Sequence, residues 1–374
     1  MKRLAAIMIC AVCAFIPLKA YAADVPETGA QVYVLYCPDN GEILASKNEN
    51  ERMKPASTTK LMTTLITLES AAKGNDIITF NKDMTAEGSS MYLKLGEQVT
   101  LRDLAVGMMM SSGNDAANAA AITIGGSSEG FAELMNERAA EIGMNNTHFV
   151  TPSGLDDDDH YSTAYDLALL MAAGLRNADF ARLTAQKSAT VDFAEPANKK
   201  ITYSNHNRLL SLYPYCIGGK TGYTMSAGRC LVSAARKDGL TLICVTLNDR
   251  RDWDDHAALY EYGFSQRCLY RSPDSAFCAE VPVVGGSTEV AVVMADQDYS
   301  FPVRTGDKEK IRRRILLDSF LYAPIGEGEK VGRIVYTLGG KEIGATPLTA
   351  AAAVTAQAEE PGLFQKIKEF FTHG

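Results

Sequence analysis

Two segments with the alternating pattern of β-strands, far apart in the chain, constrain the fold of the first 270 residues. Residues 31–48, QVYVLYCPDNGEILASKN, alternate around an Asp-Asn-Gly turn, which predicts an antiparallel hairpin. Residues 228–249, GRCLVSAARKDGLTLICVTLND, predict two more strands around a Lys-Asp-Gly turn. The sequence between these segments is mostly helical in pattern, so the sheet must be assembled from distant parts of the chain.

Helical periodicity in the intervening region predicts an α/β fold, with a mixed antiparallel sheet and a helical subdomain. Thr163 and Asp166 have the spacing of an N-terminal capping box at the start of one of these helices. The predicted helices run from Ser57 to about Ala72 and over 101–110, 114–122, 130–143 and 162–175. A further helix over 254–266 is expected to close the domain.

The composition changes near residue 275. Short β-type runs alternate with glycine turns over 275–350, which predicts a small all-β domain after a first domain at 24–270. Residues 351–374 are predicted to form a linker and then an amphipathic segment. In the segment 361–374, one helical face would carry Leu363, Phe364, Ile367, Phe370 and Phe371. We expect this segment to bind a membrane surface, although a tail docked on its own protein would show the same pattern.

The first 22 residues have the pattern of an export signal. Lys2 and Arg3 precede an apolar run over 4–18, and Ala-Tyr-Ala at 20–22 provides the small residues of a cleavage site. We expect this segment to be removed, with retention as an anchor as the alternative. Its removal takes away three cations and no acid, so the formal charge changes from −8 to −11, which argues against nucleic acid as a partner. The expected location is the outer face of the cytoplasmic membrane or the cell wall.

Histidines and cysteines give little support for a metal site. The five histidines are scattered without HExxH spacing, and the six cysteines after the export signal form no CxxC. Cys230 and Cys244 lie inside strand patterns and are predicted to be buried thiols, whereas a pairing of Cys268 with Cys278 cannot be read from the sequence. The acidic run 156–159 lacks EF-hand spacing and is interpreted as a solvated loop. We therefore expect no metal and no cofactor.

The sequence KPASTTKLMT at 54–63 places Ser57 and Lys60 three positions apart at a predicted helix start. Residues three apart share a helix face, so the Lys60 amine can reach the Ser57 hydroxyl and, when uncharged, accept its proton. The helix N-terminus would stabilise negative charge on an attacked carbonyl oxygen. The same spacing recurs at Ser70 and Lys73, but that serine lies in the last helical turn before Gly74.

Two other short motifs occur in the same predicted domain. Ser112-Gly113-Asn114 lies at a polar corner between two helical runs, and Lys220-Thr221-Gly222 precedes the second strand pair. Similar triplets at 46–48 and 304–306 do not fit the order or the domain of these motifs. Taken singly, each motif is as typical of a helix cap or a hairpin as of a site, so the functional signal lies in the combination.

The motifs SxxK, SxN and KTG, in this order, resemble those of penicillin-binding proteins and serine β-lactamases. The sequences PASTTKLMT, SSGNDAA, HYSTAYDLALL and GGKTGYTMSAGRCLVSAA are similar to the low-molecular-mass D-alanyl-D-alanine carboxypeptidases in particular. The resemblance covers nearly the whole chain, because that subfamily also has an export signal, a β-rich C-terminal domain and an amphipathic tail. It implies a β-lactamase/transpeptidase-like fold, peptidoglycan stem peptides as substrates, and β-lactam antibiotics as covalent inhibitors.

The resemblance also implies a role for each motif residue. Ser57 is the expected nucleophile, Lys60 its general base, and Ser112 the group that passes a proton to the leaving amine. Burial and the nearby Lys220 cation are expected to lower the pKa of Lys60. The implied substrate-binding residues are Asn114, Lys220, Thr221, Gly222 and Tyr223. The backbone N–H groups of Ser57 and Tyr223 are the expected oxyanion hole.

One further substrate contact and three other functions remain open. Arg250 or Arg251 is a candidate for an added carboxylate contact, and both are equally well explained as surface charges. A β-lactamase would add a water-activating glutamate, but no ExxLN-like stretch occurs between Asn114 and Lys220. A transpeptidase would deacylate onto an amine. A catalytically silent wall-binding or penicillin-sequestering module is disfavoured by the intact triplet, so we expect a serine-type carboxypeptidase.

Overall fold

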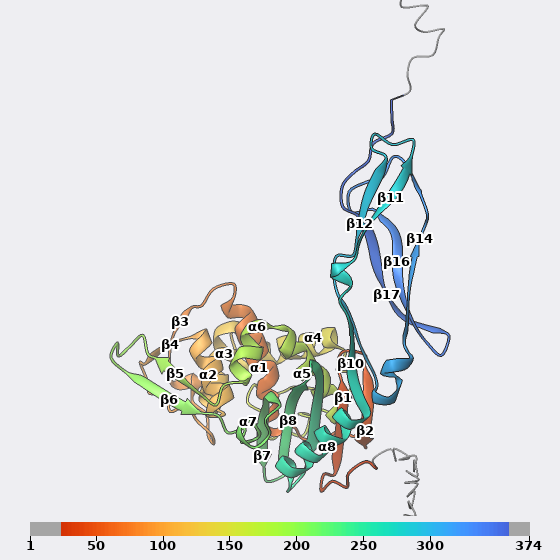
Figure 1. The fold of residues 1–374 in the computed structure, drawn as a ribbon. Coiled ribbons are helices and arrows are strands. Elements are labelled where there is room, and N and C mark those ends of the chain that lie inside the picture. The colour runs from red at the N-terminus through yellow and green to blue at the C-terminus, as the bar shows by residue number, and fades with distance from the viewer. Residues whose placement is uncertain (1–23, 359–374) are drawn as a thin grey trace, which may run out of the picture.

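The computed structural model describes residues 24–358, which form a mixed α/β domain and an elongated all-β domain (Figure 1). The fold class predicted from the sequence is confirmed. The predicted export segment 1–22 and the predicted membrane-binding segment 361–374 lie outside the described residues. No helix within 24–358 combines the length and the apolarity that crossing a lipid bilayer requires.

A five-stranded antiparallel sheet forms the centre of the first domain, in the strand order β2-β1-β9-β8-β7. Its strands are β1 (Val32–Cys37), β2 (Glu42–Lys47), β7 (Cys216–Thr224), β8 (Gly228–Lys237) and β9 (Leu240–Leu247). The N-terminal hairpin joins the later strand pair through β1 and β9, where Val34 lies opposite Val245. Both predicted hairpins are therefore confirmed, and β7 adds a strand at one edge.

Every side chain of β1 is buried, because helices cover both faces of the sheet. Alternate residues enter two different cores, as the two-residue period of a strand requires. The core shared with the helical subdomain contains Val32, Val34 and Tyr36. The core beneath α8 (Asp252–Gln266), the predicted closing helix, contains Tyr33, Leu35 and Cys37.

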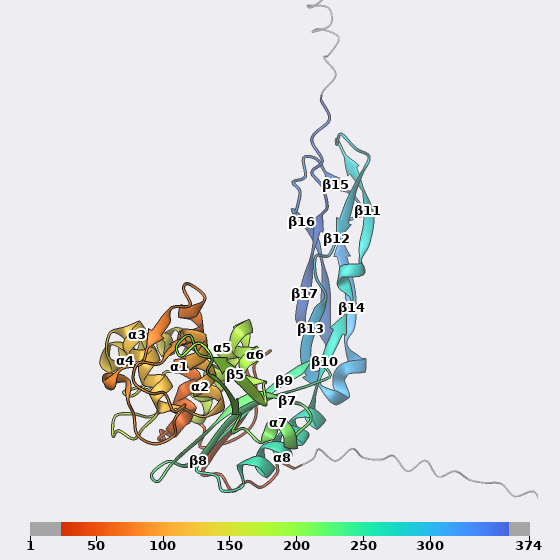
Figure 2. The ribbon, with the colours of Figure 1, turned by 90° about the vertical axis from the view of Figure 1, so that its left-hand side faces the viewer.

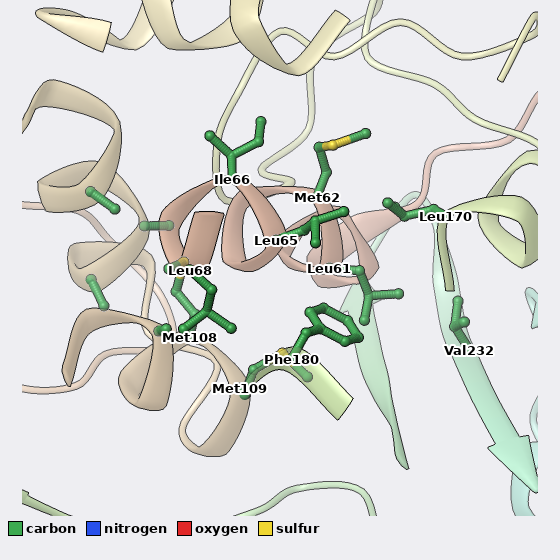
Figure 3. Packing of buried hydrophobic residues seen from close by; sticks show 14 of the residues in the cluster. Leu61, Met62, Leu65, Ile66, Leu68, Met108, Met109, Leu170, Phe180 and Val232 are labelled. Carbon is green, nitrogen blue, oxygen red and sulfur yellow. The ribbon is translucent and has the colours of Figure 1, made fainter. Parts of the chain in front are cut away.

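The helical subdomain packs on one face of the sheet and surrounds a central helix. Its helices are α1 (Lys60–Ala71), α2 (Leu101–Met110), α3 (Asn114–Gly125), α4 (Ser128–Ile142), α5 (Ala164–Arg176) and α6 (Ala178–Thr184). Helix α1 is buried on almost every side, with Leu61, Met62 and Leu65 fully enclosed (Figure 3). The predicted cap of α5 is present, since Thr163 Oγ1 accepts a hydrogen bond from Asp166 N at 3.0 Å.

Short elements connect these parts. Two ribbons pair β3 (Ile77–Thr79) with β4 (Gln98–Thr100) and β5 (Ser188–Asp192) with β6 (Lys200–Ser204). A short helix, α7 (Leu209–Leu212), precedes β7, and the 3₁₀ turns are η1 (Ala56–Thr59) and η2 (Lys82–Met84). Because η1 leads directly into the buried helix α1, its position against the sheet is set by the core.

The second domain is built around a six-stranded sheet in the order β14-β16-β17-β12-β11-β15. Figure 2 shows the strands running along the long axis of this domain. They are β11 (Cys278–Val284), β12 (Val290–Met294), β14 (Arg312–Leu317), β15 (Leu321–Tyr322), β16 (Lys330–Leu338) and β17 (Lys341–Ala350). The domain also contains the pair β10 (Arg267–Ser272) and β13 (Tyr299–Arg304) and the turns η3 (Asp274–Ala276) and η4 (Thr305–Lys310).

The start and the end of the β domain differ from the predictions. Strand β10 begins at Arg267, inside the predicted first domain, yet it pairs along its whole length with β13. The predicted linker is wrong for residues 351–357, since Val354 is buried in the β-domain core and pairs with Ile325. Gln357 N also donates to the Gly285 carbonyl at 2.8 Å. The sequence does not indicate these contacts, because an alanine-rich stretch shows neither the alternation of a strand nor the periodicity of a helix.

The six cysteines within 24–358 are free thiols. Cys230 and Cys244 are fully buried in β8 and β9, as the strand pattern predicts. Burial raises the pKa of the Cys230 thiol to about 12. Cys268 and Cys278, the nearest pair in the sequence, are not joined.

A buried carboxylate joins several strands of the β domain. Asp274, fully buried in η3, accepts hydrogen bonds from Ser272 Oγ (2.9 Å), Thr346 Oγ1 (2.7 Å) and the Tyr336 hydroxyl. Arg313 Nε lies 3.1 Å from its Oδ1 atom. Burial alone would raise the pKa of this carboxyl, but the hydrogen bonds outweigh burial and lower it below the ordinary value.

We expect the substitution Asp274→Ala to destabilise the β domain by about 3 kcal/mol, because Arg313 and three hydroxyl groups lose a buried acceptor. Denaturant unfolding followed by circular dichroism measures this loss. Asp318→Ala, at an exposed position of the same domain, is the matched control and should change the unfolding free energy by less than about 0.5 kcal/mol. Equal stability of the two variants would contradict the assigned role of Asp274.

Candidate active site

Ser57 and Lys60 lie together at the start of the central helix. Ser57 is in η1, and α1 begins at Lys60, so the serine lies in a 3₁₀ turn and not on the α-helix itself. Lys60 Nζ donates to Ser57 Oγ at 2.8 Å and to the carbonyl oxygen of Ser153 at 2.7 Å. The two side chains are therefore in direct contact, as their spacing predicts.

The surroundings of Lys60 favour the uncharged amine. Its side chain is fully buried. Burial lowers the pKa of Lys60 well below the ordinary value, and the Lys220 cation lowers it further, while Asp115 acts in the opposite direction. An uncharged amine in contact with a hydroxyl is able to take its proton, which makes this pair suited to nucleophilic chemistry.

Ser112 and Lys220 form a second contact between segments that are distant in sequence. Ser112 follows α2 and has a φ of 58°, in the left-handed region, which directs the chain sharply into α3. Lys220, on β7, donates from Nζ to Ser112 Oγ at 3.0 Å and to the Thr221 carbonyl at 2.8 Å. Burial lowers the pKa of Lys220 to about 7.

Asn114, the first residue of α3, presents a free acceptor. Its Nδ2 atom donates to the Glu87 carbonyl at 2.7 Å, which fixes the orientation of the amide. Its Oδ1 atom is buried and has no hydrogen-bond partner within residues 24–358. Because an unpaired buried acceptor is unfavourable, this atom is suited to accept an N–H group from a bound molecule.

Asp115, which no sequence pattern indicates, holds the loop of residues 89–93 beside the site. Its Oδ1 atom accepts from Met91 N at 2.8 Å, and its Oδ2 atom accepts from Ser90 Oγ at 2.7 Å and from Leu93 N at 3.1 Å. Ser89, the residue before Ser90 in this loop, borders the cleft described below. A single buried carboxylate therefore positions this loop.

Strand β7 passes close to the turn that carries Ser57. A Cβ atom added at Gly222 would lie 3.0 Å from the Pro55 carbonyl oxygen and 3.0 Å from Ser57 N. A glycine allows this approach without displacing η1. The next residue, Tyr223, is exposed. Since β7 is the edge strand of its sheet, part of its backbone is open to an extended ligand.

A cleft of about 370 Å³ opens between η1, the end of α2 and β7. The residues that line it are Ser57, Ser89, Ser112, His206, Arg208, Thr221, Gly222, Tyr223, Arg229, Asp252 and Trp253. Each of the three motifs thus contributes at least one lining residue, and Lys60 and Lys220 contact two of the lining serines. Arg208 and Arg229 make the cleft attractive to an anion even though the chain as a whole is acidic.

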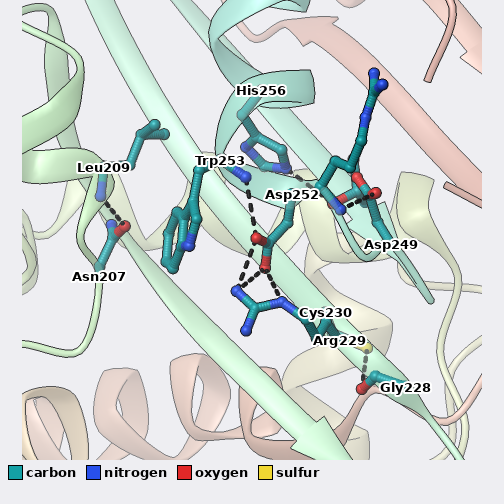
Figure 4. Close-up of polar contacts among 11 residues, drawn as sticks. Asn207, Leu209, Gly228, Arg229, Cys230, Asp249, Asp252, Trp253 and His256 are labelled. Atoms are coloured by element: carbon teal, nitrogen blue, oxygen red, sulfur yellow. Dashed lines mark hydrogen bonds and ion pairs between the residues drawn. The ribbon is translucent and has the colours of Figure 1, made fainter. Parts of the chain in front are cut away.

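The prediction for Arg250 is not supported, because this side chain is exposed and does not border the cleft. Arg251, its alternative, lies 2.8 Å from Asp255. Arg229 borders the cleft instead. Its Nη2 atom lies 2.8 Å from Asp252 Oδ1, and its guanidinium carbon lies 5.6 Å from the centre of the Trp253 ring (Figure 4).

The pairing of β7 with β8 brings Arg229 to the cleft, and this residue can be found from the sequence only once that register is known. In the hairpin of β7 and β8, Tyr223 lies opposite Arg229 and Gly222 lies opposite Cys230. Arg229 therefore lies directly across from Tyr223, the residue that follows the KTG motif, and this position is near the cleft. No sequence pattern indicates that His206 and Arg208 line the cleft, because they precede β7 in a loop whose path does not follow from strand pairing.

The second SxxK spacing lies away from this cleft. Ser70 and Lys73 are at the far end of α1 and its following turn, where they border a separate hollow together with Arg138. Arg138 is committed to ion pairs with Glu69 and Glu141, both at 2.7 Å. The spacing alone therefore does not create the contact found at Ser57.

The acidic run before His160 is largely exposed, as predicted. Asp156 nevertheless accepts hydrogen bonds from Thr224 Oγ1 at 2.9 Å and from Ser226 Oγ at 2.6 Å, at the turn after β7. His160 is buried, and its Nε2 atom lies 2.9 Å from Thr59 Oγ1. Burial lowers the pKa of His160 to about 4, so this histidine is a neutral structural group.

Comparison with known proteins finds relatives along almost the whole chain. A family model described as D-alanyl-D-alanine carboxypeptidase matches residues 19–251, and one described as penicillin-binding protein 5, C-terminal domain, matches residues 264–356. D-alanyl-D-alanine carboxypeptidase DacF of Bacillus subtilis is 33% identical over 334 residues, which cover 86% of this chain and 85% of that protein. D-alanyl-D-alanine carboxypeptidase DacC of Escherichia coli is 33% identical over 373 residues, covering 94% and 90%.

The solved structures agree with the sequence relatives. Penicillin binding protein 5 from Haemophilus influenzae has a TM-score of 0.70 and 31% identity to this chain, covering 89% of this chain and 99% of that one. A buried lysine in contact with a cleft serine, between an antiparallel sheet and a helical subdomain, defines a serine hydrolase that works through an acyl-enzyme. The chain belongs to the D-alanyl-D-alanine carboxypeptidase family.

We expect acylation by a β-lactam to slow as the pH falls, by about tenfold per pH unit below the lowered pKa of Lys60. Burial and the Lys220 cation keep the amine uncharged at higher pH, and its protonation prevents it from taking the Ser57 proton. Lys220, with a pKa of about 7, loses its charge as the pH rises past that value. The KM of a substrate with a free carboxylate should therefore increase on the alkaline side.

Rapid-mixing kinetics with a chromogenic β-lactam measure the acylation rate on the acidic side. A D-alanine assay measures the KM of the substrate on the alkaline side. Circular dichroism over the same pH range is the control for unfolding. A folded enzyme whose acylation rate does not change on the acidic side would rule out Lys60 as the proton acceptor.

Proposed function

We propose that this enzyme removes the terminal D-alanine from peptidoglycan stem peptides through an acyl-enzyme on Ser57. The observation that carries the proposal is the 2.8 Å contact from Lys60 Nζ to Ser57 Oγ. This contact opens into a cleft that also contains the Ser112 hydroxyl and the basic side chains of Arg208 and Arg229. The family of the chain supports the same activity.

Acylation uses the groups around Ser57. The Ser57 oxygen attacks the carbonyl carbon of the penultimate D-alanine, and Lys60 takes its proton. The backbone N–H groups of Ser57 and Tyr223 stabilise the oxyanion, each contributing about 3 kcal/mol. Ser112 then passes a proton to the leaving nitrogen as the C–N bond breaks. Free D-alanine departs, and water hydrolyses the ester to restore the serine hydroxyl.

Binding uses the edge of β7 and the charges beside it. An extended peptide pairs with the backbone near Gly222, and Asn114 Oδ1 accepts one of its N–H groups. Lys220 and the Thr221 hydroxyl are suited to the terminal carboxylate. We assign the additional carboxylate contact to Arg229 in place of the predicted Arg250, because Arg229 borders the cleft and Asp252 orients its planar guanidinium.

A penicillin is expected to react at the same serine, since its ring amide places a strained carbonyl beside a carboxylate. The cleft also disfavours the β-lactamase alternative. Within the described residues, Asp252 is the one carboxylate that lines it, and this group is occupied by Arg229. Without a free carboxylate to activate water, the acyl-enzyme formed with penicillin should persist.

We propose that the chain is exported and acts outside the cytoplasmic membrane. The pattern of residues 1–22 supports a cleaved export signal, and the pattern of 361–374 supports attachment to a membrane surface. Catalysis is assigned to residues 24–270, because all motif residues fall there. The β-rich domain over 275–350 separates this part of the sequence from the membrane-binding segment.

We expect the substitution Ser57→Ala to abolish both labelling by a fluorescent penicillin and D-alanine release from a pentapeptide ending in D-Ala-D-Ala. Lys60→Ala should slow acylation by about 10³-fold, within the usual range for loss of a general base. Ser70→Ala is the matched control, because it has the same sequence spacing to a lysine but lies outside the cleft. Labelling that survives in Ser57→Ala and disappears in Ser70→Ala would overturn the assignment.

We expect Arg229→Leu to raise the KM for this pentapeptide by about tenfold, through loss of one charged contact. Arg250→Leu should leave the KM unchanged. A pentapeptide with a C-terminal amide has no carboxylate for Arg229 to bind. If Arg229→Leu removes only this contact, it should raise the KM for the amide far less than the KM for the acid. An equal rise of the KM for the acid and the amide would show that Arg229 acts only as a partner of Asp252. The substitution Arg229→Lys tests whether a positive charge alone is enough for binding.

A further inference from the structure

An exposed apolar cluster lies at one end of the β domain. Val284 is 50% exposed, Phe320 46% and Tyr322 69%, although all three belong to or adjoin strands. We call these three residues the apolar tip. Val284 and Tyr322 are paired in the parallel ladder of β11 and β15, and the rings of Phe320 and Tyr322 are 5.4 Å apart.

The strand geometry explains why these side chains point outward. Leu321, between the two aromatic residues, is buried in the β-domain core. Because successive side chains of a strand point in opposite directions, burial of Leu321 directs Phe320 and Tyr322 to the outside. Their exposure is therefore built into the fold. Contiguous exposed apolar residues of this kind mark an interaction surface.

The described chain ends beside the apolar tip. Gln357 N donates to the Gly285 carbonyl at 2.8 Å, and Ala356 forms a bridge with Gly286. Gly285 directly follows Val284, so the described chain ends next to the tip. Figures 1 and 2 both show the end of the described chain at the end of the β domain farthest from the helices. The sequence that follows is the amphipathic segment with Lys366 and Lys368.

We propose that the apolar tip is a second membrane contact, in which Phe320 and Tyr322 enter the interface of a lipid bilayer. The Tyr322 ring carries a polar hydroxyl, which favours this boundary, and Phe320 contributes apolar area. One short amphipathic segment binds reversibly, and a second contact held beside it increases the total affinity without a new partner. This contact adds to the proposed role of 361–374 but is made by different residues.

The charge around the tip sets the kind of lipid that it fits. Asp318, Glu329 and Lys330 line one hollow with Phe320 and Tyr322, so two carboxylates and one cation lie beside the tip, whereas the amphipathic segment carries Lys366 and Lys368. Because the charges in this hollow sum to a net negative value, binding through the tip does not depend on anionic lipid. Binding through Lys366 and Lys368 does depend on it. The two contacts therefore differ in their response to lipid charge.

Vesicle flotation of residues 24–374 tests the proposal with phosphatidylcholine alone and with added phosphatidylglycerol. We expect the double substitution Phe320→Ser and Tyr322→Ser to weaken binding about tenfold in both lipids, through loss of buried apolar area. Deletion of 361–374 should remove the part of the binding that phosphatidylglycerol adds. Met294→Ser is the matched control, because Met294 is 38% exposed and lies opposite Cys278, at the other end of the same hairpin.

The aromatic swap Phe320→Tyr with Tyr322→Phe should keep full binding, and thermal unfolding verifies that every variant is folded. Unchanged flotation of the double serine variant in both lipids would overturn the proposal. The same holds if the serine variant changes the oligomeric state in the absence of lipid, because the tip would then be a contact between protein chains. Failure of Ser57 labelling would leave this result unaffected, so the two proposals are tested separately.

Discussion

The arrangement depends on an amine that is buried and in contact with a serine hydroxyl. Removing Lys60 from water is unfavourable unless the amine is uncharged or well paired, and here it donates to Ser57 and to the Ser153 carbonyl. The enclosure of α1 by the other helices creates this environment. The stability of the helical core and the reactivity of the serine are thus opposed at one residue, because burial keeps the amine uncharged, and so able to accept a proton, only by making its charged form unfavourable.

The second buried lysine connects this pair to the sheet. Lys220 reaches Ser112 from β7, and its charge also lowers the pKa of Lys60. Three segments separated by long stretches of sequence therefore share one electrostatic environment. Gly222 completes it, since its missing side chain lets β7 lie against the turn of Ser57. Each element is ordinary by itself, and the site results from how closely the sheet edge approaches the helix.

The sequence predicted the parts of this protein that depend on local pattern. Alternation identified the hairpins of the central sheet, and three-residue spacing identified the contact of Ser57 with Lys60, because both are properties of neighbours in the chain. Long-range packing was not predictable in the same way. Arg229 enters the cleft through strand register, and Val354 joins the β-domain core from an alanine-rich stretch without periodicity. The charge of Arg250 favours a contact with the substrate carboxylate, but this side chain is exposed and does not border the cleft.

The approach of β7 to η1 has a consequence for solubility. An edge strand of nine residues with an open row of backbone groups is a template on which another chain can add as a strand, which leads to aggregation. The 3₁₀ turn packs against Gly222, and Thr184 Oγ1 occupies the edge at Gly219, where it accepts from the backbone N–H at 2.8 Å and donates to the carbonyl at 3.3 Å. A long foreign strand is therefore blocked, while a short peptide still fits beside the turn. The exposed part of the edge is thus long enough for a short ligand and too short to template a whole strand.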